Sequence, residues 1–164
     1  MAVLVALVWC AGCSPADEQD LDIGSRDAAA AAARCDDAGS LLAQIDCYVT
    51  LATEEDDPSV CGLSPEGGAR YQCFAILAER LVRRDLCDEI PPASPDHLQL
   101  KDICISDVAK QTADGRMCDE ITTIGLRDSC YAKIGQGSDD KSLCDKIEDP
   151  GLRSMCSGEP VMVE

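Results

Sequence analysis

The chain has 164 residues, a formal net charge of -17 and one Trp, three Tyr and one Phe, so it is long enough for one domain but poor in the large side chains that usually fill a core. Its negative charge repels phosphate backbones and anionic head groups, which excludes nucleic acid as an expected partner. Twelve cysteines offer another source of stability, because disulfides persist in oxidising compartments and replace a missing core.

The first segment, residues 2 to 12, is uncharged and mostly apolar. It is too short to span a bilayer as a helix, which needs about 20 residues, but it suits the apolar region of a secretory signal. The sequence Cys10-Ala11-Gly12-Cys13 resembles the lipobox of bacterial lipoproteins, in which small residues precede a cysteine that is lipidated and becomes the first mature residue. This resemblance implies a signal peptide at residues 1–12, lipidation of Cys13 and membrane attachment through the lipid anchor alone.

Ser14 follows Cys13 where an aspartate would resemble an inner-membrane retention signal, so the resemblance favours the outer membrane of the cell envelope. The alternative is an ordinary cleaved signal with Cys13 as a free thiol, which predicts a periplasmic or secreted protein. We expect residues 13–27 to form a flexible acidic tether, residues 28–157 to form the folded domain and residues 158–164 to form a C-terminal tail.

The ten cysteines that remain are regularly spaced. Successive gaps alternate between 12 and 14 residues, apart from one gap of 17, so the pattern recurs every 26 residues with one insertion. A period of this length indicates tandem supersecondary units. We number the units 1 to 5, each with a first and a second cysteine: Cys35 and Cys47, Cys61 and Cys73, Cys87 and Cys104, Cys118 and Cys130, Cys144 and Cys156.

Each unit is predicted to contain a short helix and a longer helix. Apolar residues flank the first cysteine at positions -1 and +3, as Leu86 and Ile90 do in unit 3, and these positions share a helical face. The second cysteine is followed by apolar residues at +1 and +4 and by a small residue at +5, which predicts close approach of a neighbouring helix. The small residues are Ala52, Ala78, Ala109 and Gly135.

A capping side chain before a proline predicts the start of a helix. Four such pairs lie within the predicted folded domain: Asp57-Pro58, Ser64-Pro65, Ser94-Pro95 and Asp149-Pro150. The expected fold class is therefore all-α, with tandem short helix-turn-helix repeats of about 26 residues, disulfide-stapled and stacked as a short solenoid.

Two disulfide registers are compatible with the spacing. A continuous helix separates residues 12 apart by about 18 Å, whereas bridged Cα atoms lie about 5.5 Å apart, so either register requires the chain to reverse. Pairing across the 14-residue gaps would leave Cys35 and Cys156 at opposite ends of the stack. We favour pairing of the first with the second cysteine in every unit, because it leaves no cysteine out.

The sequence offers little catalytic or metal-binding chemistry. Zinc and thioredoxin-like motifs need closely spaced cysteine pairs, and Cys10 and Cys13 in the signal region are the only such pair. His97 is the sole histidine, and Asp20, Asp22 and Gly24 resemble a calcium loop only in part. We therefore predict no catalytic, cofactor-binding or metal-binding residues. The basic cluster of Arg80, Arg83 and Arg84 has two interpretations, a contact patch or a helix end that complements the helix dipole.

The anchor, the repeats and the scarcity of catalytic residues together predict an envelope-anchored, non-enzymatic lipoprotein that acts as a structural or protein-interaction scaffold. Its expected partner is a protein of the cell envelope, and its oligomeric state stays open. One alternative is a small-ligand binder or enzyme whose site lies at the insertion of unit 3, Pro91 to His97. Another is an acidic protein that binds divalent cations.

Overall fold

The computed structural model describes residues 23–138 and 141–158, and in this part of the chain it contains helices and no strand. The helices follow in the order α1 (Ile23–Asp36), α2 (Leu41–Glu54), η1 (Pro58–Leu63), α3 (Gly68–Leu81), η2 (Arg84–Glu89), α4 (Pro95–Thr112), η3 (Met117–Glu120), α5 (Ile124–Gly137), α6 (Ser142–Asp145) and α7 (Pro150–Ser157), where η marks a 3-10 helix. The expected all-α class is confirmed. The predicted signal peptide and Cys13 lie outside the described residues.

The first helix begins earlier than the sequence predicts. The predicted domain starts at residue 28, but α1 starts at Ile23 and runs into the alanine-rich stretch. Ser25 and Asp27 are residue types that could cap a helix starting at residue 28, but both belong to α1. The last residues of the expected tether are therefore helical.

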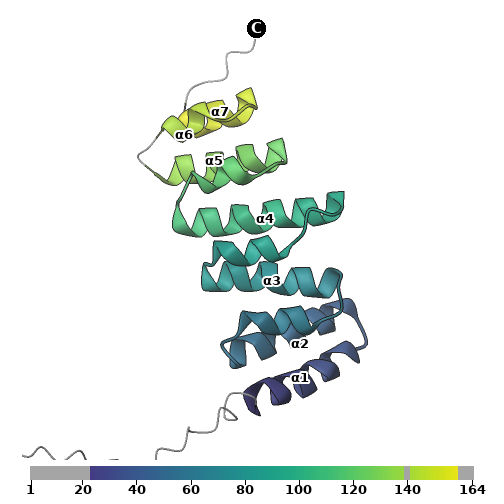
Figure 1. The fold of residues 1–164 in the computed structure, drawn as a ribbon. Helices are drawn as coiled ribbons and strands as arrows, with labels where there is room; N and C mark the ends of the chain where they lie inside the picture. Colours follow the sequence, from purple (N-terminus) through teal and green to yellow (C-terminus); the bar gives the residue numbers. More distant parts are fainter. Residues whose placement is uncertain (1–22, 139–140, 159–164) are drawn as a thin grey trace, which may run out of the picture.

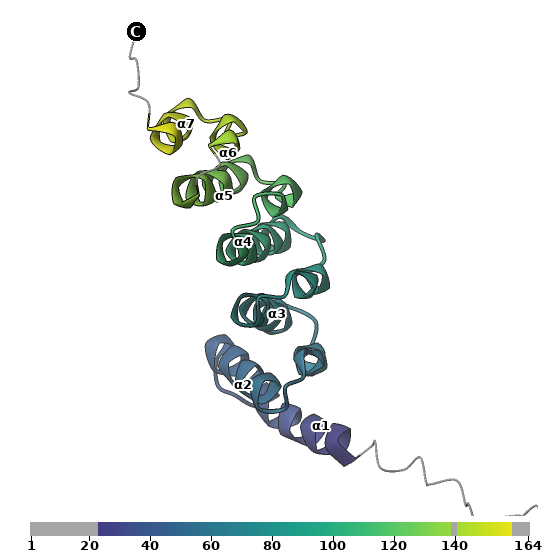
Figure 2. The same cartoon turned by 90° about the vertical axis from the view of Figure 1, so that its left-hand side faces the viewer.

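The long helices lie beside one another in chain order (Figure 1). Each contacts the next, from α1 to α5, and α5 contacts α7. Seen from the side, α2, α3, α4, α5 and α7 form one layer, and the 3-10 helices lie next to them in a second layer together with α1 and α6 (Figure 2). No described helix is both long enough and apolar enough to cross a membrane.

Five disulfides connect the two layers. They join the first cysteine to the second in every unit, with Cα–Cα distances of 5.5 to 5.8 Å: Cys35–Cys47, Cys61–Cys73, Cys87–Cys104, Cys118–Cys130 and Cys144–Cys156. This is the register that the sequence favours. Each bond links the helix of the first cysteine to the helix that follows, because the chain reverses between them. The first of these helices is short in units 2 to 5, as predicted, whereas in unit 1 it is α1, with 14 residues.

The core consists of the residues that the cysteine pattern singles out. The +3 residues Ile90, Ile121 and Ile147 are buried, and the equivalent residue of unit 2 is the buried Ser64. The small +5 residues are buried as well, and Gly135 shows why they are small. A Cβ atom at Gly135 would lie 2.8 Å from Sγ of Cys156 and 3.1 Å from Sγ of Cys144, so it is the next disulfide, rather than a crossing helix, that approaches closely.

Three of the four predicted caps are formed. Asp57 accepts the backbone N–H of Ser59 at the start of η1, Ser94 accepts that of His97 in α4, and Asp149 accepts that of Leu152 in α7. The prediction that Ser64-Pro65 starts a helix is wrong. Ser64 ends η1, and α3 begins at Gly68 after an extended turn through Gly67, whose φ of 143° suits glycine.

Two buried carboxylates fix the starts of later helices. Asp102, on α4, accepts the backbone N–H groups of Thr122 and Thr123 at 3.1 and 2.7 Å. Asp128, on α5, accepts those of Glu148 and Asp149, the latter at 2.8 Å. α4 thereby holds the entry to α5, and α5 holds the entry to α7, by binding backbone N–H groups that a helix cannot satisfy at its own start.

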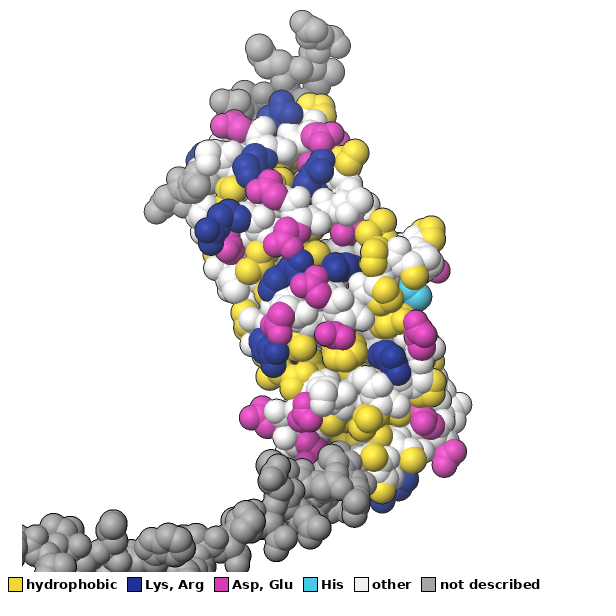
Figure 3. All heavy atoms as spheres, in the orientation of Figure 1, with side chains coloured by type: hydrophobic (Ala, Val, Ile, Leu, Met, Phe, Trp, Pro, Cys, Tyr) yellow, Lys and Arg dark blue, Asp and Glu magenta, His cyan; other side chains and the backbone are white. Residues whose placement is uncertain are grey.

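The surface carries charges of both signs. On the face drawn in Figure 3, Lys and Arg side chains lie next to Asp and Glu side chains, with hydrophobic side chains between them. Several ion pairs connect different units, including Lys146 with Asp119 at 2.9 Å and Arg84 with Glu120. Exposed pairs such as these contribute little each, about 0 to 1 kcal/mol.

Candidate functional site

The residue directly after the first cysteine differs in one unit only. It is an aspartate in units 1, 3, 4 and 5 and a glycine, Gly62, in unit 2. The residue directly after the second cysteine is aromatic in units 1, 2 and 4. The disulfide holds these two positions close together, and in units 1 and 4 their side chains are in contact.

Units 1 and 4 close this position with a hydrogen bond. Tyr48 donates its hydroxyl hydrogen to Asp36 at 2.7 Å, and Tyr131 donates in the same way to Asp119. Burial, followed by the bond to Asp36, raises the pKa of Tyr48 to about 12. The bond from Tyr131, followed by that from Lys146, lowers the pKa of Asp119.

Unit 2 cannot form this bond. Phe74 stands where the tyrosine would be and has no hydroxyl, and Gly62 replaces its acceptor. The backbone does not demand glycine here, because Gly62 has no positive φ and a Cβ atom would meet nothing within 4 Å. The missing side chains leave a groove between η1 and η2 instead.

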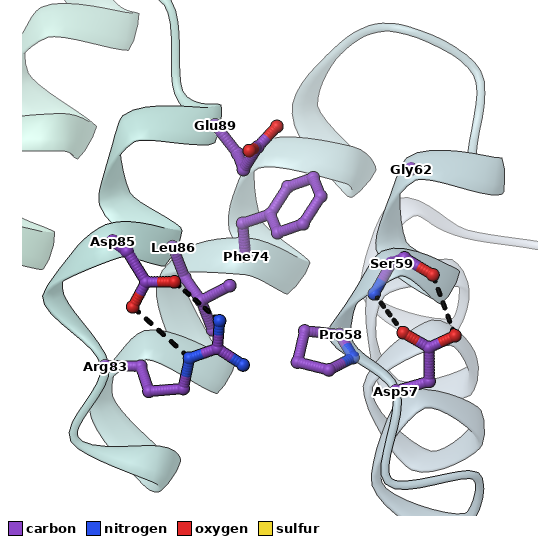
Figure 4. A pocket seen from close by; sticks show the side chains of 9 residues that line it. All are labelled: Asp57, Pro58, Ser59, Gly62, Phe74, Arg83, Asp85, Leu86 and Glu89. Carbon is purple, nitrogen blue, oxygen red and sulfur yellow. Dashed lines mark hydrogen bonds and ion pairs between the residues drawn. The ribbon is translucent and has the colours of Figure 1, made fainter.

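The groove has a volume of about 410 Å³ and lies between units 2 and 3. Figure 4 shows Phe74 in its centre, with Pro58 and Ser59 on the side of η1 and Leu86 and Glu89 on the side of η2. Its remaining lining residues are Asp57, Gly62, Arg83 and Asp85. The groove therefore combines an apolar floor with a charged rim, as binding sites commonly do.

Most of the rim charges are already paired. Arg83 binds Asp85 through two bonds, Nε to Oδ1 at 3.2 Å and Nη2 to Oδ2 at 2.5 Å, and the bond from Arg83 lowers the pKa of Asp85. Asp57 accepts the N–H and the hydroxyl of Ser59 at 2.9 and 2.8 Å. Glu89 has no side-chain partner among the residues that the structure describes. The rim keeps a net negative charge.

A second groove, of about 340 Å³, lies in the equivalent place between units 4 and 5. Its residues are bonded to one another. Lys146 lies with its Nζ 5.2 Å from the centre of the Tyr131 ring and bonds both oxygens of Asp119, at 3.1 and 2.9 Å. Arg127 pairs with Glu148 across the same groove. In this groove a lysine of the chain itself thus lies over the aromatic ring.

The predicted candidates near the insertion of unit 3 have structural positions. His97 lies in the first turn of α4 with its ring edge-on to Tyr71, the centroids 4.8 Å apart. Tyr71 in turn donates to Glu66 at 3.0 Å. The two grooves between units are lined by other residues than Pro91 to His97. His97 therefore packs against α3 at this point.

The arginine cluster separates into three environments. Arg80 is exposed in the last turn of α3, and Arg83 lines the groove in its pair with Asp85. Arg84 contacts Asp88 at 3.1 Å and also pairs with Glu120 of unit 4. The cluster thus includes an interunit ion pair as well as one residue of the groove.

The remaining candidates concern metal binding and lipidation. Within residues 23–138 and 141–158, no three His, Cys, Asp or Glu side chains are grouped so that they could hold a metal ion. Asp20 and Asp22 of the possible calcium loop, like Cys13, lie outside these residues, and Gly24 belongs to α1. Comparison of the chain with protein-family models, with curated proteins and with solved structures found no match.

Sequence reasoning missed the groove although the signal is present in the sequence. The repeat pattern drew attention to what the units share, whereas the groove arises where unit 2 departs from it. An alignment of the five units would have shown that Gly62 stands where the other four units have aspartate, and that unit 2 also carries Phe74 after its second cysteine. The depth of the groove, by contrast, depends on how η1 and η2 pack and needs the structure.

Proposed function

We propose that this protein is a short helical solenoid of tandem 26-residue repeats that binds a protein partner at the cell envelope through the groove beside Gly62. It acts as a non-enzymatic scaffold, tethered to the outer membrane by a lipid on Cys13. The observation that carries this proposal is the groove beside Gly62 in unit 2, at the position where units 1 and 4 have a tyrosine–aspartate bond.

The solenoid part of the proposal is supported by the way successive units join. The same contact recurs between neighbours, since Asp102 and Asp128 occupy the same place, two residues before the second cysteine, and each binds the entry of the next long helix. Stacked repeats offer extended surfaces to protein partners, because each unit contributes one strip of a continuous face.

The proposal of binding is supported by Gly62, because no contact in the fold requires a glycine at this position. An aspartate at position 62 would fit in open space, because nothing lies within 4 Å of a Cβ atom at Gly62. A glycine that no contact requires, present in one unit only, is typical of a site kept open for a ligand.

The test is site-specific photo-crosslinking in cells that express the full-length protein. A photoreactive phenylalanine analogue is placed at position 62, and in a matched variant at position 125, where a Cβ atom on Gly125 would likewise meet nothing within 4 Å. We expect a discrete crosslinked protein from position 62 and none from position 125. Equal crosslinking at both positions, or none at either, would contradict binding at the groove.

The anchor is tested separately by intact mass of the protein extracted from envelopes. Cleavage before Cys13 with attached acyl chains supports the tether, whereas a mature chain with a free Cys13 thiol supports the alternative of a periplasmic or secreted protein. Replacement of Cys13 by Ser should release the protein from the membrane fraction, because the acyl chains supply the membrane affinity.

A further inference from the structure

We infer that the groove beside Gly62 receives a lysine or arginine side chain of a basic peptide segment, with the cation over Phe74 and paired with Glu89. This inference rests on the proposed function of the groove and names the chemistry of its partner. Its basis is the second groove of the same molecule, which shows how a cation is held in the equivalent place.

The two grooves have equivalent components. Tyr131 and Phe74 both follow the second cysteine of their units, so each supplies an aromatic ring at the floor. Lys146 and Glu89 both stand two residues after the first cysteine of the following unit. Unit 3 thus supplies a carboxylate at the position where unit 5 supplies the lysine over Tyr131, and Arg83, the cation that lines the groove between units 2 and 3, is already paired with Asp85.

A lysine or arginine side chain from a partner fits the groove chemically. A cation within about 6 Å of a ring centre is attracted by the ring face, as Lys146 is by Tyr131 at 5.2 Å. Figure 4 shows the Glu89 carboxylate beside the Phe74 ring, where it would neutralise such a charge. The aliphatic stem of a lysine or arginine would lie along Leu86 and Pro58, as long basic side chains do on apolar surfaces.

The rest of the charge distribution favours the same partner. Arg83 is neutralised by Asp85, so it does not repel an incoming cation at short range. Glu89 keeps an unpaired carboxylate, and the whole chain has a formal charge of -17, which attracts basic segments and repels acidic ones. The volume of about 410 Å³ is larger than one basic side chain requires and leaves room for part of a neighbouring residue.

The probe is a phage-displayed library of random heptapeptides selected on the full-length oxidised protein. We expect enrichment of peptides that carry a lysine or arginine next to an apolar residue. Their binding should weaken roughly tenfold when that lysine is replaced by the neutral norleucine or when Glu89→Gln is introduced, and it should weaken as salt is raised.

Two controls separate this inference from the proposed function. Gly62→Trp fills the groove and should abolish binding, whereas Gly125→Trp should leave it unchanged, and circular dichroism establishes that both variants fold. Asp145→Asn removes the same charge as Glu89→Gln at the far end of the stack and should have little effect. Peptides that need an open groove but carry no basic residue would overturn the inference and leave the groove as a binding site. Peptides that bind Gly62→Trp as well as the wild type would overturn both.

Discussion

The carboxylate of Asp102 accepts the backbone N–H of Thr123 at 2.7 Å and so fixes the start of α5 from within α4. It is 1% exposed, and it accepts the N–H of Thr122 as well. Asp128 makes the same connection from α5 to Asp149, at the start of α7. Hydrogen bonds to buried carboxylates therefore join unit 3 to unit 4 and unit 4 to unit 5, in addition to apolar contacts.

Replacing Asp102 by Asn should destabilise the protein by about 1 to 3 kcal/mol, because the amide keeps one acceptor oxygen and turns a buried NH2 group towards an N–H donor. Denaturant unfolding monitored by circular dichroism measures the change. Asp107→Asn serves as a control, since Asp107 forms only a surface pair with Lys110 and its loss should change stability by about 0.5 kcal/mol or less. Equal effects of the two substitutions would mean that Asp102 is not a connecting residue.

Gly135→Ala should destabilise the protein although alanine favours helices. The new methyl group would lie 2.8 Å from Sγ of Cys156, and a disulfide yields less readily than a flexible side chain. We expect a loss of about 1 to 3 kcal/mol by overpacking. Gly125→Ala is the matched control on the same helix, because nothing lies within 4 Å there, and it should be neutral or slightly stabilising. Thermal unfolding of both variants distinguishes the two effects.

Tyr48 should make stability fall at alkaline pH. Burial raises its pKa from 10 to about 12, so the folded state keeps the phenolic proton after the unfolded state has lost it. Its contribution is therefore complete below about pH 10 and is lost as the pH rises from about 10 to 12. Tyr48→Phe should lower the free energy of unfolding at neutral pH. The difference from the wild type should disappear as the pH rises from about 10 to 12. A deficit that stays constant up to about pH 12, measured by rapid denaturant unfolding, would contradict the assignment.

The first disulfide should be reduced before the others. Cys47 is only partly buried, and the Cys35–Cys47 pair lines a groove of about 260 Å³ at the open end of the stack. The cysteines of the other four pairs are 0 to 3% exposed, which protects them from an attacking thiolate. Brief treatment with a mild reductant, followed by alkylation and peptide mass mapping, should label Cys35 and Cys47 first. Initial labelling of any other pair would contradict this order.

The sequence predicted what the units have in common and missed what depends on packing between them. The cysteine spacing led to the all-α class and to the disulfide register, because chain reversal is a simple geometric demand. Ser64-Pro65 misled because a capping residue before proline also occurs where a 3-10 helix ends. The connecting role of Asp102 could not be predicted, since a lone aspartate in an acidic chain gives no sign of burial.

The groove could be predicted from the sequence only in part. The combination of Gly62 with Phe74 is visible in the sequence once the units are superposed, whereas the free carboxylate of Glu89 is not. Glu89 becomes notable only because the structure places it beside Phe74, where Lys146 stands over Tyr131 in the equivalent groove. Departures from a repeat pattern thus indicate where to look, and side-chain geometry indicates which chemistry the position serves.

Closing the open groove with the chain's own residues is the sharpest test of whether it binds a partner. The double variant Gly62→Asp, Glu89→Lys gives units 2 and 3 the aspartate and the lysine that units 4 and 5 carry as Asp119 and Lys146. The measurement is the dissociation constant of a groove-dependent peptide by fluorescence anisotropy, with thermal unfolding alongside. We expect peptide binding to be lost while the melting temperature is kept or raised. Undiminished binding to the folded double variant would contradict a binding role for the groove.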